Sequence, residues 1–86
     1  MASYKLLIKA SAAKELEALP RKDRSRMVVK MEGLADNPHP PGSEKLSGEE
    51  KYRLRQGDYR VLYSIQDASA TVTIVKIGHR RDVYRR

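Results

Sequence analysis

The sequence predicts an α+β fold of order β-α-α-β-β-β, in which two N-terminal antiparallel helices pack on one face of a small antiparallel sheet. Apolar residues recur at the spacing of a helix face between residues 11 and 35, and they alternate with a period of two from Tyr52 onward. A loop with three prolines and one glycine, residues 36–43, separates the two patterns. The 86 residues are enough for a single domain, residues 1–86.

The first half of the chain contains one predicted strand and two predicted helices. Residues 4–9 form a short strand, and Ser11 is placed to cap the N-terminus of the first helix. Pro20 ends this helix and favours the start of the next one, because proline is tolerated in the first turn of a helix. The second helix extends to about Ala35. The apolar stripes are Ala12, Ala13, Leu16 and Leu19 in the first helix, and Met27, Val28, Met31, Leu34 and Ala35 in the second.

The second half of the chain reads as three consecutive strands. Residues 45–48 form a short edge segment or a turn, and the first long strand begins at Tyr52. Turns at residues 56–58 and 67–70 divide the rest into two further strands, and the β-branched segment 71–77 is the clearest strand of the chain. Strands joined by such short turns form an antiparallel meander.

The alternation places three arginines on the face of the sheet that the helices leave open. Tyr52 and Leu54 point toward one face, so Arg53 and Arg55 point toward the other. The next strand buries its odd-numbered positions, and Arg60 therefore also lies on the open face. Tyr59 and Tyr63 belong to the buried positions and, like Tyr52, are predicted core residues. Convergent arginines on an open sheet face form a binding surface.

The charge and composition narrow the class of function. Eighteen Lys and Arg against eleven Asp and Glu give a net charge of +7, which favours an anionic partner such as nucleic acid or an acidic protein. Solubility alone is the simpler alternative. The chain has no cysteine, which excludes disulfides and thiolate sites. The apolar run near the N-terminus, residues 6–8, is too short for a signal peptide or a membrane span, so we expect a cytoplasmic protein without membrane contact.

Cleavage of RNA without a metal needs the residue types that cluster in this chain. When a 2′-hydroxyl attacks the adjacent phosphate, the developing charge must be stabilised, and a proton acceptor and a proton donor are required. Arginine binds phosphate with a permanent charge, and stacking of a base on an aromatic ring is worth about 1–3 kcal/mol. The residues that fit these needs are Arg53, Arg55, Arg60, Arg80, Arg81 and Tyr84. Alternatively, these arginines are solvated charges or a docking surface for an acidic protein.

Three further observations concern Arg80 and the histidines. Arg80 shares the parity of Ile74 and Lys76 if the last strand continues that far. His39 lies between prolines in a loop and is interpreted as structural. His79 could act as an acid or base near neutral pH, or it could simply cap the strand. Two distant histidines without cysteine argue against a metal site, and we expect no cofactor.

Three motifs carry a family resemblance. They are Tyr52-Arg-Leu-Arg, then Gly57-Asp-Tyr-Arg-Val-Leu-Tyr63, and then Gly78-His-Arg-Arg-Asp-Val-Tyr84. In this order and at this spacing they resemble the RelE/ParE superfamily of bacterial toxins. Matching segments Ala13-Lys-Glu-Leu-Glu-Ala-Leu-Pro-Arg, Leu34-Ala-Asp-Asn-Pro and Lys45-Leu-Ser-Gly extend the resemblance to nearly the whole chain.

The resemblance implies the toxin of a type II toxin–antitoxin system, and it favours the RelE-like branch because the chain has both Arg80 and Tyr84. RelE-like members cut mRNA in the ribosomal A site. By position, Arg60 would stabilise the phosphorane, Arg80 would act on the leaving group, and Tyr84 would orient or stack the cut nucleotide. Arg81 and Arg85 would add phosphate contacts. The alternatives are a ParE-like poison of DNA gyrase and a catalytically inactive member of the same fold that only binds an antitoxin or RNA.

One departure from the RelE-like pattern changes the chemistry. Arg53 and Arg55 stand where RelE-like nucleases commonly carry lysines. Arginine keeps its proton, with a pKa above about 12, so both residues can bind phosphate but are poor general bases. The resemblance then leaves the base open, since relatives also use Glu or His. The candidates for the general base are His79, Asp58, Glu49 and Glu50.

The resemblance also implies the partners. A cognate antitoxin would cover the basic face of this chain with an acidic, amphipathic segment. The ribosomal A site and mRNA would be the target, with contacts to 16S rRNA. Operator DNA would be bound only through the antitoxin, because no predicted helix here resembles a recognition helix.

Overall fold

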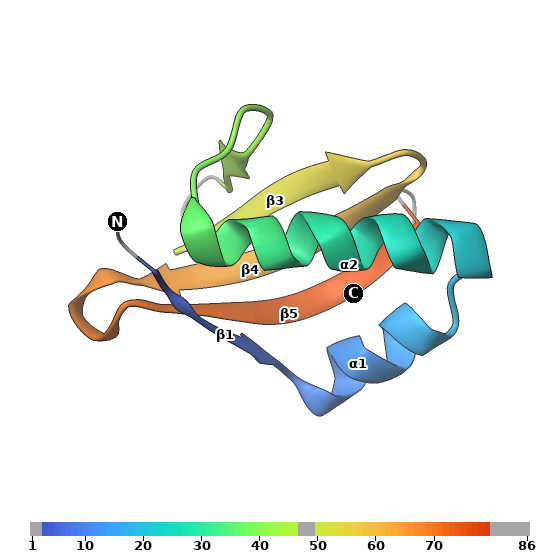
Figure 1. Ribbon diagram of the computed structural model, residues 1–86, viewed down its shortest axis with the longest axis horizontal. Coiled ribbons are helices and arrows are strands. Elements are labelled where there is room, and N and C mark those ends of the chain that lie inside the picture. Colours follow the sequence, from blue (N-terminus) through green and yellow to red (C-terminus); the bar gives the residue numbers. More distant parts are fainter. Residues whose placement is uncertain (1–2, 47–49, 80–86) are drawn as a thin grey trace.

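The computed structural model describes residues 3–46 and 50–79, and over these ranges it confirms the α+β class (Figure 1). Two α-helices and the four predicted strands form in the predicted order, and a two-residue strand, β2, brings the sheet to five strands. The elements are β1 (Lys5–Ile8), α1 (Ala10–Glu17), α2 (Arg21–Asp36), β2 (Glu44–Lys45), β3 (Lys51–Gln56), β4 (Tyr59–Gln66), a short 3-10 turn (Asp67–Ser69) and β5 (Thr71–His79).

The sheet is mixed, which corrects the prediction of a purely antiparallel one. Its strand order is β1-β5-β4-β3-β2, and the meander of β3, β4 and β5 is antiparallel as predicted. However, β1 pairs in parallel with β5, with Lys5 opposite Thr71 and Ile8 opposite Ile74. The short turns between consecutive strands predict the meander. The strand that pairs with β1 could not be predicted, because two helices separate β1 from the other strands along the sequence.

The two helices cover one face of the sheet, and the core lies between them. Figure 1 shows α2 lying across β3, β4 and β5, while α1 follows the end of β1 beside β5. The buried core residues come from both the helices and the sheet, and the tyrosines predicted to be internal belong to this core or pack against it. The core cluster is Ala12, Leu19, Met27, Met31, Leu34, Leu54, Val61, Tyr63, Val72, Ile74 and Ile77.

The start of α1 differs from the prediction, because Ser11 does not cap it. Lys9 occupies the N-cap position with extended backbone, and Ser11 lies inside the first turn. The N–H of Lys9 donates to the carbonyl of Ile74, so the chain passes directly from strand pairing into the helix. Pro20 precedes α2 as predicted, and α2 ends at Asp36, one residue beyond the predicted end.

A β-bulge in β5 breaks the simple alternation of the last strand. Tyr63 pairs with Ile74, whereas the preceding Leu62 pairs with Lys76, so that Val75 is an extra residue. Ile74 lies in the core, while Lys76 follows the row of Leu62 on the other face. The prediction that Ile74 and Lys76 share a face is therefore wrong. Arg80, which was placed by the same parity, lies outside the described residues.

The second half of β5 is held by a side chain because β1 no longer reaches it. Beyond Ile74 the outer edge of β5 lies next to α1, and Glu15 of α1 takes the place of a strand partner. Its Oε1 accepts a hydrogen bond from the backbone N–H of Ile77 at 3.0 Å, and its Oε2 pairs with Nζ of Lys76 at 3.2 Å. Both carboxylate oxygens thus tie α1 to the strand that carries Gly78 and His79.

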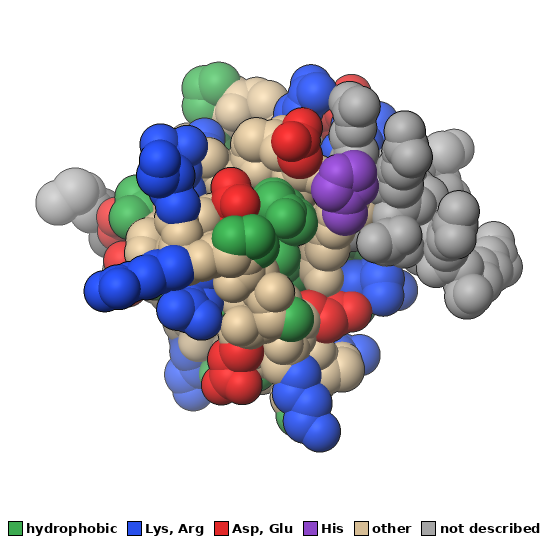
Figure 2. Space-filling view, turned by 90° about the vertical axis from the view of Figure 1, so that its right-hand side faces the viewer, with side chains coloured by type: hydrophobic (Ala, Val, Ile, Leu, Met, Phe, Trp, Pro, Cys, Tyr) green, Lys and Arg blue, Asp and Glu red, His purple; other side chains and the backbone are tan. Residues whose placement is uncertain are grey.

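The surface of the described part of the chain is rich in charge. In Figure 2 basic side chains project on several sides of the molecule, with acidic side chains between them. Within residues 3–46 and 50–79, neither helix combines the length and the apolar character needed to cross a lipid bilayer.

Candidate functional site

A pocket on the open face of the sheet brings the three predicted arginines together. It has a volume of about 250 Å³ and is lined by Gly42, Glu44, Arg53, Arg55 and Arg60. The arginines come from β3 and β4, and the other two residues come from the loop before β2 and from β2 itself. The prediction that Arg53, Arg55 and Arg60 share a face is confirmed by this arrangement.

The β3–β4 hairpin sets the spacing of the arginines. Arg55 lies directly opposite Arg60, and Arg53 is two residues further along the same strand, opposite Leu62. The turn places Gly57 at φ +62°, a left-handed conformation that glycine adopts without strain. Because like charges directly opposite each other destabilise a sheet, the Arg55–Arg60 pair costs stability that a bound anion would offset.

Arg60 is partly sunk into the pocket. Its residue is only partly exposed, and its Nε atom is buried. A guanidinium that is sunk into a pocket next to other guanidinium groups provides a strong, fixed positive charge, since arginine does not lose its proton in proteins. In the register of the sheet Arg60 also pairs with Gly78 of β5, which has no side chain to cover the pocket on that side. The arrangement suits a phosphate group.

Glu44 lies in this pocket and was missed in the sequence analysis. Within the two-residue strand β2, Glu44 pairs with Arg53 in the sheet register. Nε of Arg53 donates a hydrogen bond to Oε1 of Glu44 at 2.9 Å, and the Glu44 side chain keeps 64 % of its surface exposed. The signal for this placement is weak in the sequence, because it depends on the register of a strand of only two residues. The site therefore contains a carboxylate beside its three arginines.

The structure separates His79 from the arginine pocket. His79 pairs with Tyr59 in the sheet register, and their rings meet edge to face with centroids 5.7 Å apart. Tyr59 packs against the core on the helix-covered face. Since Arg60 is the neighbour of Tyr59 and points to the opposite face, His79 and the arginines lie on different sides of the sheet.

The other predicted base candidates do not line the pocket either. Asp58 lies exposed in the β3–β4 turn, and Glu50 pairs with Lys45 at 3.7 Å with 90 % of its side chain exposed. Glu49 lies outside the described residues, as do the predicted site residues Arg80, Arg81, Tyr84 and Arg85. Of the predicted phosphate-binding residues, the structure thus places Arg53, Arg55 and Arg60, which form the arginine pocket.

A stack of aromatic rings supports the loop that forms one wall of the pocket. The ring of His39 meets Tyr52 edge to face at 5.2 Å, and Tyr52 stacks on Tyr63 at 5.8 Å. The hydroxyl of Tyr63 donates to the carbonyl of Pro38 at 2.9 Å. Burial raises the pKa of the Tyr63 phenol, although a hydrogen bond with Ser43 acts in the opposite direction. His39 thus contacts the core aromatics, in line with the structural role predicted for it.

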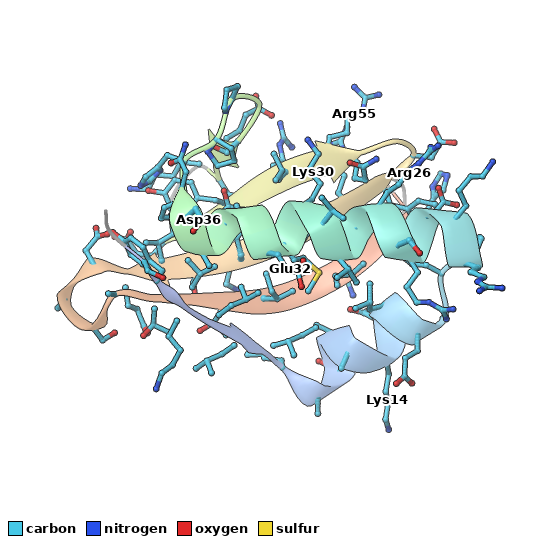
Figure 3. All side chains as sticks on the ribbon, in the orientation of Figure 1. Lys14, Arg26, Lys30, Glu32, Asp36 and Arg55 are labelled. Carbon is cyan, nitrogen blue, oxygen red and sulfur yellow. The ribbon has the colours of Figure 1, made fainter. Side chains whose placement is uncertain are left out.

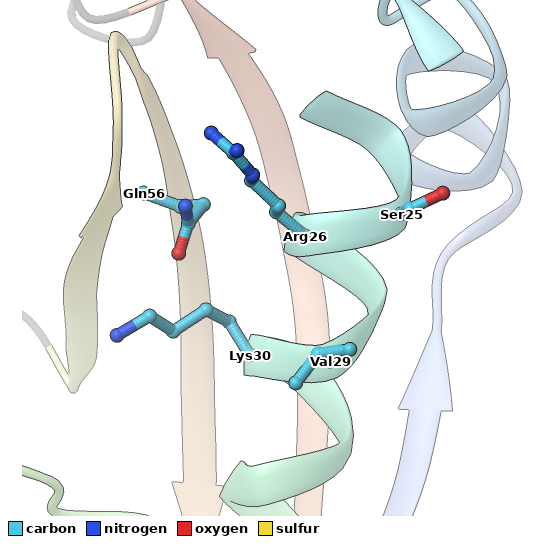
Figure 4. A pocket seen from close by; sticks show the side chains of 5 residues that line it. All are labelled: Ser25, Arg26, Val29, Lys30 and Gln56. Carbon is cyan, nitrogen blue, oxygen red and sulfur yellow. The ribbon is translucent and has the colours of Figure 1, made fainter. Parts of the chain in front are cut away.

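A second hollow lies on the other side of β3, against α2. Its volume is about 310 Å³, and it is lined by Ser25, Arg26, Val29, Lys30 and Gln56 (Figure 4). In the close view Arg26 and Lys30 project from successive turns of α2 toward Gln56, and in Figure 3 both lie on the same side of the view as Arg55. Val29 is 68 % exposed. Two cations beside an exposed apolar residue suit an acidic amphipathic segment rather than catalysis.

The described residues do not form a group of side chains that could bind a metal ion. Over residues 3–46 and 50–79, no three His, Asp or Glu side chains come together as metal ligands would. The chemistry that the pocket itself offers is the binding of an anion by guanidinium groups, with a carboxylate as the accompanying acceptor of a proton or a hydrogen bond.

Comparison with protein families identifies what the chain is similar to. Residues 6–84 match the family described as the ParE toxin of the type II toxin–antitoxin system parDE. Toxin RelE of Mycobacterium tuberculosis is 38 % identical over 84 residues, which cover 95 % of this chain and 87 % of that relative.

Solved structures agree with the fold. The toxin–antitoxin complex RelBE2 from Mycobacterium tuberculosis contains a chain with 30 % identity and a TM-score of 0.82, and the match covers 95 % of this chain and 97 % of that one. The archaeal RelE–RelB complex from Pyrococcus horikoshii contains a chain with 28 % identity and a TM-score of 0.79, with 93 % and 98 % covered. The isolated Escherichia coli RelE toxin, at 22 % identity and a TM-score of 0.79, shares the fold.

Proposed function

The chain belongs to the ParE toxin family of type II toxin–antitoxin systems and is close to the RelE toxins, and from this premise we propose that it is a ribosome-dependent endoribonuclease. It would cut mRNA in the ribosomal A site and so inhibit translation. The observation that carries the proposal is the pocket in which Arg53, Arg55 and Arg60 converge on the open face of the sheet. Three fixed positive charges in one pocket match the charge that develops when a 2′-hydroxyl attacks the adjacent phosphate.

Each arginine of the pocket has a proposed role. Arg60, whose Nε atom is buried, holds the non-bridging oxygens of the phosphate and stabilises the phosphorane. Arg55, opposite Arg60 in the hairpin, binds the same phosphate from the other strand, and Arg53 binds the backbone next to it. Removing one such contact in related chemistry lowers the rate by about 10²- to 10³-fold.

The residues that follow β5 complete the proposed site from the sequence alone. Arg80 would act on the leaving group, and Tyr84 would orient or stack the cut nucleotide. Arg81 and Arg85 would bind neighbouring phosphates of the RNA. Because His79 lies on the helix side of the sheet, it does not reach the pocket arginines in this structure, and its proposed acid or base role would require a different placement.

The proposed partners follow from the family. A cognate antitoxin would bind this chain, as RelB binds RelE in the Pyrococcus horikoshii complex. The proposed targets are the ribosomal A site with its mRNA, with contacts to 16S rRNA made by the basic surface. Operator DNA would be bound only through the antitoxin. With these partners the protein would act in the cytoplasm.

Primer extension on a reporter mRNA in a purified translation system tests the proposal. The wild-type protein is expected to produce cuts only when programmed ribosomes are present, at a fixed position within a codon. Arg60→Ala should abolish the cuts, whereas Arg21→Ala on the exposed start of α2 should leave them unchanged. Cuts in free mRNA, or none at all while translation continues, would contradict the proposal.

A poison of DNA gyrase is the second candidate, because the matching family model is that of the ParE toxin. Under this alternative the protein would block supercoiling by purified gyrase and leave translation intact. The same Arg60→Ala variant distinguishes the two, since a gyrase poison has no need of a phosphorane-stabilising charge.

A further inference from the structure

We propose that Glu44 is the proton acceptor in the arginine pocket, taking the proton of the attacking 2′-hydroxyl; this inference rests on the proposed nuclease function. Glu44 is the carboxylate among the five residues that line the pocket, and it lies at its edge on the short strand β2. It is an acidic residue on a surface that otherwise gathers arginines. This position beside the arginines is the observation from which the proposal is argued.

The pocket needs a proton acceptor that its arginines do not supply. A guanidinium group keeps its proton in proteins, so Arg53, Arg55 and Arg60 act as donors and charges only. A carboxylate oxygen, unlike a guanidinium group, can accept a proton in the transition state. Glu44 supplies this missing function.

The geometry prepares Glu44 for this role. Its Oε1 accepts the hydrogen bond from Nε of Arg53 at 2.9 Å, which fixes the direction of the carboxylate. Among the described residues Glu44 uses Oε1 for this bond, so Oε2 is left to receive a proton. The side chain is 64 % exposed, which lets a bound RNA reach it. Arg53 holds Glu44 through Nε, and its positive charge lies in the same pocket as Arg55 and Arg60. Arg53 is thus the positioning residue for Glu44.

The competing carboxylates and the histidine lie elsewhere. Glu50 is engaged with Lys45 and does not line the pocket, and Asp58 is exposed in the hairpin turn. His79 lies on the helix-covered side of the sheet against Tyr59. Glu44 is the described residue that combines a basic oxygen with a place beside the phosphate-binding arginines.

The proposed step balances as a transesterification. The 2′-oxygen forms a bond to phosphorus while its proton passes to Oε2 of Glu44. The bond from phosphorus to the 5′-oxygen breaks, its electron pair leaves with the 5′-oxygen, and that oxygen takes a proton from water. The products are a 2′,3′-cyclic phosphate and a 5′-hydroxyl, and Glu44 returns its proton to solvent. No oxidant, reductant or further reactant is needed.

A different role for Glu44 predicts the opposite result. If the carboxylate only occupies Arg53 until RNA arrives, it competes with phosphate, and its removal would strengthen RNA binding and leave cleavage unchanged or faster. The glutamine variant separates the two roles, because its amide oxygen can still accept the hydrogen bond from Arg53 but is not an effective base.

The test measures single-turnover cleavage of mRNA on saturating programmed ribosomes, together with the affinity for those ribosomes. Glu44→Gln is expected to lower the cleavage rate by about 10²- to 10⁴-fold with affinity unchanged or higher, and Glu44→Asp to retain part of the rate. Glu32→Gln is the matched control, since Glu32 lies on α2 on the helix side of the sheet (Figure 3).

Each other outcome has a definite meaning. A Glu44→Gln rate equal to or above that of the wild type overturns the assignment of Glu44, and so does a loss that is explained entirely by weaker ribosome binding. A wild-type protein that does not cut mRNA at all overturns the nuclease function itself, and the inference falls with it. Circular dichroism of each variant verifies that the fold is kept.

Discussion

Tyr63 illustrates how a single side chain connects the core with the site. Its ring is fully buried, and its hydroxyl reaches the carbonyl of Pro38 in the loop that leads to Gly42 and Glu44. Because the loop carries three prolines, few of its own N–H groups can hold it to the sheet. The phenol of Tyr63 therefore anchors the wall of the pocket from inside the core.

Removal of this hydroxyl should destabilise the protein modestly. Tyr63→Phe deletes the hydrogen bond to Pro38 while the ring stays in place, and the expected loss is about 0.5–1.5 kcal/mol of unfolding free energy. Tyr52→Phe is the matched control: its ring stacks on Tyr63, and no hydrogen bond of its hydroxyl is found among the described residues. Urea unfolding of the three proteins measures the difference. Equal losses for both variants would show that the bond to Pro38 contributes nothing of its own.

The same phenol predicts a loss of stability at alkaline pH. Burial raises the pKa of Tyr63 in the folded protein above its ordinary value of 10.0, whereas the unfolded chain keeps that value. Above pH 10 the unfolded state therefore releases the proton more readily, and the unfolding free energy falls as pH rises until the folded-state pKa is passed. Below pH 10 this contribution is fully present.

Thermal unfolding between pH 9 and pH 11 measures this effect. The wild type should lose more stability over this range than Tyr63→Phe. Tyr52→Phe should keep most of this loss, because burial, the largest cause of the raised Tyr63 pKa, remains, while the smaller contribution of Tyr52 is removed. Lys and other Tyr side chains titrate in all three proteins, so only the difference between variants reports Tyr63. Parallel curves for the wild type and Tyr63→Phe would contradict the prediction.

At the scale of elements, β5 depends on a side chain where it lacks a strand partner. Glu15 fixes the half of β5 that follows the bulge, which otherwise has an open edge. Glu15→Ala removes the acceptor of a partly buried N–H and is expected to cost about 1–3 kcal/mol. Glu15→Gln keeps an acceptor and loses mainly the ion pair with Lys76. The Lys76 side chain is 36 % exposed, and such an ion pair is worth about 0–1 kcal/mol.

Urea unfolding ranks these variants, and amide hydrogen exchange locates the effect. The N–H of Ile77 should exchange faster in Glu15→Ala than in Glu15→Gln. Lys76→Met serves as the control that removes the ion pair alone. If Lys76→Met destabilised the protein as much as Glu15→Ala, the ion pair and not the backbone contact would hold the strand.

The elements that local patterns define were predictable, and those that depend on distant pairing were not. The periodicity of α2 and the turn at Gly57 predicted the helix and the hairpin, and with them the shared face of Arg53, Arg55 and Arg60. The bulge at Val75 was not predicted, because β-branched residues suit either register. The pairing of β1 with β5 was not predicted, because the two strands are far apart in the sequence. The position of Glu44 beside Arg53 was not predicted either, because a strand of two residues is too short to show an alternating pattern.

For the whole molecule, the charge determines how strongly binding depends on salt. With a net charge of +7 and three arginines in one pocket, the affinity for single-stranded RNA should fall as salt rises, with a logarithmic slope of about −0.7 for each phosphate contacted. Arg55→Ala should make this negative slope less steep by about 0.7, because one phosphate contact is lost. Arg21→Ala, which lies outside the pocket, should lower the affinity only slightly.

Fluorescence anisotropy of a labelled RNA oligonucleotide at several salt concentrations gives these slopes. A slope that both substitutions change equally would mean that RNA follows the general positive field and does not use the pocket. A slope near zero for the wild type would argue against phosphate contacts of any kind.

The parallel pairing of β1 with β5 has a consequence for synthesis and folding. Lys5 to Ile8 leave the ribosome well before their partner residues Thr71 to Ile74 are made. Until then the helices lack the strand that supplies Val72, Ile74 and Ile77 to the core. Contacts between such distant segments slow folding. The β3–β4 hairpin, which carries the three arginines of the pocket, therefore gains its neighbouring strand β5 late. A nascent chain interrupted before β5 would lack the complete sheet that holds this hairpin in place.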